Sequence, residues 1–415
     1  RQLSEFSISL PERRVMKNGM PLNIINAGTE DVVRFDLLIG GGQWHQEQPL
    51  QAMFTNRMLR EGAGSMTSAQ IAEKLDYYGA WLELSSSVNY GFITLYSLNK
   101  YFSRTLSVIA EMVKTPLFPI KELSDTNKQQ FLVNSTRVEM IARKQLNRAL
   151  FGAEHPFGRY AVAEDYDRIT PEVLHDFYRK YYHSGNCSVY ISGKVTPDII
   201  RSVEENLGNE AWGEVKDKPV MQAVVPRTTS EKHLFVERED ALQSSLKMGS
   251  FVMERHHPDF LKARVMVTLF GGYFGSRLMS NIREEKGYTY GIGAGIVSYP
   301  DSGILIISTE AANEYINPII TEVYREMDKL CNEPVPQEEL EMVKNYMLGD
   351  LCRSYEGPFS LSDAWIYIET AGLDDKFFIR SLDAIRGITR EEIQRLAQTY
   401  FCKENLIEVV AGKKV

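Results

Sequence analysis

Apolar and polar positions follow the same order twice along the chain. Residues 32–42 and 244–252 are short runs that contain many apolar side chains, and each run predicts a β-strand. Helical periodicity follows each run, and alternating segments broken by turn residues then occupy residues 81–98 and 288–311. Long amphipathic helices come next in both blocks. The pattern predicts two similar sets of strands and helices in one chain.

Each block ends with an amphipathic helix and a short apolar strand. The first block ends with a helix at 171–182 and a strand at 188–192, and the second with a helix at 390–401 and a strand at 406–411. Mixed elements in this order favour an α+β fold, in which helices pack on one face of a largely antiparallel sheet.

Matching residues indicate an internal duplication. Ile169-Thr170-Pro171-Glu172 recurs as Ile388-Thr389-Arg390-Glu391, and Gly193-Lys194 recurs as Gly412-Lys413. The spacing is 219 residues in both cases. We therefore expect two homologous domains, 1–215 and 230–415, joined by a charged, proline-containing segment near 214–231.

Composition narrows the possible partners. The chain has 415 residues, of which 43% are hydrophobic and 25% charged, so it can bury two full cores. Its formal charge of −8 argues against nucleic acid or an anionic membrane as the main partner. The longest apolar run, at 265–274, is shorter than the roughly 18 residues of a membrane span. We expect a soluble protein without a transmembrane segment, cytoplasmic or periplasmic if the source is bacterial.

Residues 49–62 carry a recognisable helix motif without its metal ligands. The segment Leu50-Gln51-Ala52-Met53-Phe54-Thr55-Asn56-Arg57 resembles the G-L-x-H-F-L-E-H-M helix of the inverted zincins, the pitrilysin, insulin-degrading enzyme and processing peptidase family. In that family two His side chains at i and i+4 bind zinc, and a Glu activates the metal-bound water. The resemblance places Ala52, Thr55 and Asn56 at these three positions.

The replacements remove the chemistry of the motif. Ala52 has no donor atom, Thr55 is not a base near neutral pH, and the Asn56 amide is a poor zinc ligand beside imidazole. The family has a third ligand, a Glu on a later helix, and the best register places Asn134 there. We therefore expect no zinc and no other cofactor in this chain, and no peptidase activity from the chain alone.

A second family signature is present in the other half. The segment from Phe274-Gly275-Ser276-Arg277-Leu278 to Tyr290 resembles the family's F-S-S-R-L…I-R-E-x-x-G-x-x-Y. The resemblance implies that Arg283 and Tyr290 bind the substrate backbone and stabilise an oxyanion, since guanidinium and phenol groups donate hydrogen bonds to oxygen. Two structural alternatives remain open at this stage. Arg283 could pair with Glu284 or Glu285 on a solvated helix face, and Tyr290 could pack across strands.

The resemblance covers nearly the whole chain and implies a LuxS/processing-peptidase-like fold, two similar domains facing a peptide-sized cavity. A lost zinc site with a retained Arg/Tyr pair resembles the non-catalytic subunit of a heterodimeric peptidase. The partners implied are a peptide or unfolded polypeptide and a zinc-bearing homologous subunit, or a second copy of the chain. One alternative is an inert scaffold or peptide-binding protein, resembling the core subunits of the respiratory cytochrome complex. The least favoured alternative is a peptidase with an atypical metal site.

Overall fold

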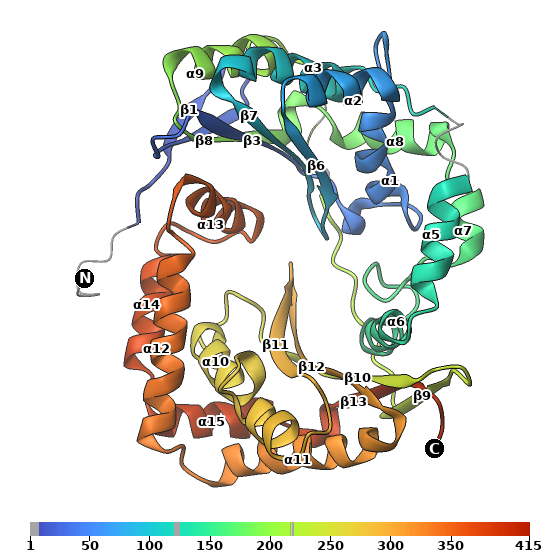
Figure 1. Cartoon of the computed structure of the whole chain (residues 1–415), viewed down its shortest axis with the longest axis vertical. Coiled ribbons are helices and arrows are strands. Elements are labelled where there is room, and N and C mark those ends of the chain that lie inside the picture. The colour runs from blue at the N-terminus through green and yellow to red at the C-terminus, as the bar shows by residue number, and fades with distance from the viewer. Residues whose placement is uncertain (1–7, 120–124, 216, 218–219) are drawn as a thin grey trace. The chain divides into compact units, whose positions relative to one another are not determined.

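The computed structural model describes residues 8–119, 125–215, 217 and 220–415, which form two compact units (Figure 1). The first unit groups residues up to Phe131 with Ala161–Ala223 and Ser354–Asp375. The second unit groups Leu132–Tyr160, Val224–Arg353 and Lys376–Val415. Within the described ranges, no helix has the length and apolar character needed to cross a bilayer.

The first unit is built on a six-stranded sheet in the order β1-β2-β8-β3-β7-β6. The pairing is antiparallel except between β2 and β8, which are parallel. The strands are β1 (Glu12–Val15), β2 (Pro21–Asn26), β3 (Val32–Ile39), β6 (Trp81–Ser86), β7 (Gly91–Leu98) and β8 (Cys187–Gly193), and β4 (Gly62–Ala63) and β5 (Met66–Thr67) form a separate hairpin. The helices are α1 (Gln51–Arg57), α2 (Ser68–Tyr77), α3 (Phe102–Lys114), α7 (Ala163–Asp167), α8 (Pro171–Tyr181), α9 (Pro197–Val203) and α13 (Pro358–Thr370), and α5 (Asp125–Ser135) spans the boundary with the second unit.

The second unit is built on a five-stranded sheet in the order β11-β12-β10-β13-β9. Only β13 and β9 are parallel among its pairs. The strands are β9 (His233–Glu237), β10 (Gln243–Val252), β11 (Ile292–Tyr299), β12 (Ser302–Ala312) and β13 (Ile407–Gly412). The helices are α6 (Val138–Phe151), α10 (Phe260–Val267), α11 (Ile316–Asn332), α12 (Gln337–Arg353), α14 (Phe377–Gly387) and α15 (Arg390–Tyr400), and two π-helical segments, η7 (Thr268–Gly272) and η8 (Met279–Glu285), follow α10.

The two sheets confirm the predicted α+β duplication. The strand order β2-β8-β3-β7-β6 of the first sheet is repeated as β9-β13-β10-β12-β11 in the second, with the parallel pair at the same place. The register is repeated as well, because Asp36 lies opposite Tyr190 and Lys247 lies opposite Val409. Tyr190 and Val409 are 219 residues apart, the spacing of the sequence repeat.

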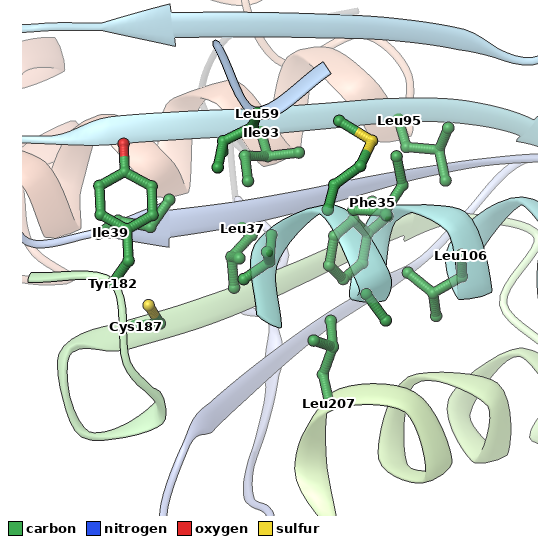
Figure 2. Packing of buried hydrophobic residues seen from close by; sticks show 14 of the residues in the cluster. Phe35, Leu37, Ile39, Leu59, Ile93, Leu95, Leu106, Tyr182, Cys187 and Leu207 are labelled. Atoms are coloured by element: carbon green, nitrogen blue, oxygen red, sulfur yellow. The ribbon is translucent and has the colours of Figure 1, made fainter. Parts of the chain in front are cut away.

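Alternating residues of the central strands build the core of the first unit. Phe35, Leu37 and Ile39 of β3 point to the same face, which the period of two residues in a strand requires. Figure 2 shows these side chains together with Leu106 of α3 and Leu207, and all five are at most 1% exposed. In Figure 1, α2, α3 and α9 lie over this sheet.

The opposite face of each sheet is covered by a helix from the other half of the sequence. In the first unit, α13 packs on β8 and β2, and it appears as an orange-red helix beside blue and green strands in Figure 1. In the second unit, α6 packs on β10 and β13. The compact units therefore differ from the sequence halves 1–215 and 230–415 in these two segments. Because α6 and α13 occupy corresponding places in the repeat, the exchange is reciprocal.

Candidate functional site

The helix with the zinc-motif resemblance is packed into the first unit. Helix α1 lies against α8 and β6, and its Ala52, Thr55 and Asn56 are 2%, 0% and 1% exposed. Leu50, which precedes the helix, has a φ of 74°, in the left-handed region that L-residues rarely adopt. The helix that resembles the zinc motif is thus present, and its ligand positions are buried. The backbone is strained at the residue that precedes it.

Internal hydrogen bonds occupy the polar groups at these positions. The Thr55 hydroxyl donates to the Gln51 carbonyl at 2.7 Å, and the Asn56 amide donates to the Phe92 carbonyl at 3.2 Å. Space is also limited here, because a Cβ atom placed on Gly91 would lie 3.5 Å from Asn56 Nδ2 and 3.0 Å from the Tyr182 hydroxyl. Both side chains act as structural partners of the backbone.

These residues do not fit a zinc ion. Ala52 brings no donor atom, and the Asn56 amide nitrogen is directed at a carbonyl rather than at an open space. Asn134 lies near the end of α5 and belongs to the second unit, whereas α1 belongs to the first. Among the residues that the structure describes, no three His, Cys, Asp or Glu side chains form a group able to hold a metal ion.

Arg283 lies on the π-helical segment η8 of the second unit. Its Nε atom donates a hydrogen bond to the Tyr290 carbonyl at 2.9 Å, and its guanidinium lies 4.9 Å from the centre of the Phe274 ring. No described carboxylate forms an ion pair with Arg283, so the sequence alternative of a pair with Glu284 or Glu285 does not hold. π-Helical turns are uncommon and often mark functional segments.

Tyr290 is exposed, whereas the residue before it, Thr289, is held by hydrogen bonds. The Thr289 hydroxyl interacts with the Thr309 hydroxyl at 2.9 Å and donates to the Glu310 carbonyl at 2.7 Å. Tyr290 itself is 92% exposed, so it is not the packed cross-strand residue of the second alternative. The anchored backbone presents the phenol to solvent.

A buried polar network holds η8 against α11. Asn281, two residues before Arg283, donates to Glu322 at 3.0 Å and to Glu326 at 2.9 Å, and both carboxylates belong to α11. The three side chains are at most 8% exposed. At the end of the segment, Gly287 adopts a φ of 66°, which glycine tolerates best. The position of Arg283 is therefore set by α11 and by this turn.

Phe274 is a residue of this site that the sequence analysis quoted but did not assign. Its ring is 62% exposed, and it supports one face of the Arg283 guanidinium. We call Phe274, Arg283 and Tyr290 the Arg283 clamp. The sequence carried a usable signal, since an aromatic residue precedes the helical segment that contains Arg283. Only the fold shows that the ring and the guanidinium meet.

Comparison with known proteins shows which families and proteins the chain resembles. Residues 168–347 match the family described as Peptidase M16 inactive domain. A Bacillus subtilis relative, named uncharacterized zinc protease YmxG, is 22% identical over 96% of this chain and 98% of its own length. A Helicobacter pylori relative, named non-peptidase homolog YmxG, is 24% identical over 75% of this chain and 72% of its own length.

A solved structure shares the fold over nearly the full length. The crystal structure of a peptidase M16 inactive domain from Pseudomonas fluorescens superposes with a TM-score of 0.84 at 22% identity, covering 98% of each chain. The duplicated sheets and the motif helix without zinc ligands agree with these matches, so the chain is similar to proteins of the M16, or pitrilysin, peptidase family, and its residues 168–347 match that family's inactive domain.

Proposed function

We propose that this chain is a substrate-binding subunit without catalytic activity of its own. It supplies Arg283 and Tyr290 to the active site of a zinc-bearing M16 partner. The observation that carries the proposal is the contrast between two helices of the chain. The ligand positions of α1 are buried and hydrogen-bonded, whereas the Arg283 clamp is anchored from below and open to solvent.

The geometry of the clamp suits a peptide oxygen. A guanidinium held on one side by an aromatic ring and a backbone carbonyl keeps its remaining donors oriented, which reduces the entropy lost on binding. The exposed Tyr290 phenol can donate to a developing oxyanion. This chemistry needs no metal in this chain, and it requires a partner that provides the nucleophile.

Reconstitution tests the proposal. The chain is mixed with a homologous subunit that keeps H-x-x-E-H, and peptide cleavage is measured for each protein alone and for the complex. We expect cleavage only from the complex. Arg283→Ala and Tyr290→Phe should each lower kcat/KM by about 10- to 1000-fold, as expected for loss of a transition-state donor, while the complex still elutes intact in gel filtration.

A control variant separates this role from a general effect of removing an arginine. Arg264 is exposed in the same unit and lies over the Phe260 ring at 5.9 Å, so Arg264→Ala removes a similar stacked side chain. We expect it to retain full activity. If Arg283→Ala/Tyr290→Phe also retains full activity in a verified complex, the chain acts as a scaffold instead.

A further inference from the structure

Two nitrogen atoms of the Arg283 guanidinium have no partner among the described residues. Its Nε is bonded to the Tyr290 carbonyl, and one of its faces lies over Phe274. The Nη1 and Nη2 groups form no hydrogen bond or ion pair within the part of the chain that the structure describes. Because the guanidinium is planar, these two groups lie in one plane, and together they can donate to a single partner as a fork.

The chain itself shows what such a fork binds. Arg13 donates from Nη1 and Nη2 to the two carboxylate oxygens of Asp375 at 2.9 and 2.8 Å. The chain has 55 acidic residues, yet no described one occupies the fork of Arg283. A backbone carbonyl offers one oxygen, whereas a carboxylate offers two in matching geometry.

We propose that the Arg283 clamp binds a peptide carboxylate, either the C-terminal group or an acidic side chain. The inference rests on the proposed function and specifies the substrate class of that site. The carboxylate lies against Nη1 and Nη2, and the exposed Tyr290 phenol provides a third donor. The 62% exposed Phe274 ring provides an apolar surface for the adjoining side chain.

Four matched peptides distinguish the two sources of the carboxylate. All are acetylated octapeptides of the same alternating Leu and Ser sequence. One has a free C-terminus, one a C-terminal amide, one an amide with a central Glu, and one an amide with a central Gln. Affinity is measured by calorimetry for the wild-type full chain, Arg283→Ala, Arg283→Lys and Arg264→Ala.

The expected result is a preference for the charged member of at least one pair. The free acid should bind about 10- to 100-fold more tightly than the amide, or the Glu peptide than the Gln peptide, as for a charge-assisted bidentate bond. The preference should vanish in Arg283→Ala, decrease in Arg283→Lys, which keeps the charge without the fork, and remain in Arg264→Ala. The pair that shows the preference identifies the source.

Other outcomes overturn the inference in distinguishable ways. If charged and neutral peptides bind equally and Arg283→Ala weakens all four, the carboxylate inference fails and the proposed function stands. If Arg283→Ala changes no affinity, or no peptide binds at millimolar concentration, the carboxylate inference fails, and the reconstituted cleavage assay then decides the proposed function separately.

Discussion

Single residues at the α1 ligand positions have become part of the core. Thr55 and Asn56 bond to backbone carbonyls, and Ala52 leaves no space that a larger side chain could enter without displacement, since it is 2% exposed. Because these positions are buried and hydrogen-bonded, we expect that placing a single ligand at one of them does not create a zinc site.

Asn56→His tests this view. The imidazole is larger than the amide and loses the bond to the Phe92 carbonyl. We expect the free energy of unfolding to decrease by about 1–3 kcal/mol, from overpacking and the unpaired carbonyl. We also expect no zinc in the protein by elemental analysis. Glu73→His, on the exposed side of α2, should change neither quantity. One tightly held zinc per chain in Asn56→His would contradict the prediction.

We expect His45 to make the stability of the first unit depend on pH. Burial lowers the pKa of His45 to about 4, and its Nδ1 accepts a hydrogen bond from the Gly42 amide at 3.1 Å. Above pH 6.5 the ring is neutral in both the folded and the unfolded chain. As the pH falls from 6.5 toward 4, the unfolded chain binds a proton that the folded chain excludes, so stability decreases, and below about 4 this contribution no longer changes.

The loss can be measured by urea unfolding at pH 7 and pH 4.5. The full shift in the pKa of His45 corresponds to a loss of about 3 kcal/mol in the free energy of unfolding. Because the ring is partly exposed, we expect this loss to be reduced to about 1–2 kcal/mol. His45→Asn keeps an acceptor for the Gly42 amide but does not titrate. Its stability should therefore fall less than that of the wild type between the two pH values. An equal fall in both proteins would show that His45 does not contribute.

At the scale of elements, buried charge accompanies the exchange of α13. Arg34 of β3 pairs with Asp36 at 2.8 Å and with Asp363 of α13 at 2.6 Å. Burial raises the pKa of Asp36, and the Arg34 charge opposes that rise. The corresponding positions of the second sheet, under α6, are Ser245 and Lys247. The two sheets thus offer different polar faces to their helices.

Arg34→Met should be strongly destabilising, because it leaves the Asp36 carboxylate buried without a cation. We expect a loss of about 3–5 kcal/mol in the free energy of unfolding at pH 7. Asp363→Asn should cost about 1 kcal/mol or less, since the Asp363 side chain is 68% exposed. The double variant Arg34→Met/Asp36→Leu should recover much of the loss. Equal effects of Arg34→Met and Asp363→Asn in chemical denaturation would refute the buried-pair argument.

The sequence predicted the positions of the strands and helices more completely than it predicted which of them pack together. The strands at 32–42 and 244–252 and the helices at 171–182 and 390–401 appear as β3, β10, α8 and α15, because hydrophobic periodicity is a local signal. The exchange of α6 and α13 was not predictable, because hydrophobic periodicity does not specify which of two sheets a helix packs on. The Asp363 bond to Arg34 links residues 329 positions apart, and periodicity carries no such information.

The same distinction applies to the candidate site. Similarity to the family's sequence motifs selected Arg283 and Tyr290. It also identified Ala52, Thr55 and Asn56 as the motif positions that lack a zinc ligand or base. It did not show that the ligand positions are buried or that Phe274 supports the guanidinium. Both facts depend on neighbours from other segments of the chain. The roles assigned to these residues remain predictions that the cleavage and binding experiments address.

At the scale of the whole molecule, each compact unit needs residues from both halves of the sequence. The first unit without α13 would expose the face of its sheet that carries Arg34, Ser188 and Tyr190. In the complete chain, Ser188 donates to Glu369 at 2.8 Å, and the α13 residue Trp365 is 2% exposed. The sequence halves are thus repeats of one another, whereas each compact unit contains a segment exchanged from the other half.

Fragments of the chain test this organisation. Residues 1–215 expressed alone lack α13, so we expect a protein with weak near-ultraviolet circular dichroism and no cooperative unfolding, because an uncovered sheet face exposes apolar area and unpaired polar groups. Co-expression with residues 216–415 should yield a soluble complex. A fusion of 1–215 to 354–376 through a Gly/Ser linker should restore cooperative unfolding by itself, since that segment supplies the missing cover. If 1–215 alone unfolds cooperatively as a monomer in gel filtration and denaturant titration, α13 is an accessory of a self-sufficient domain, and the exchange has no role in folding.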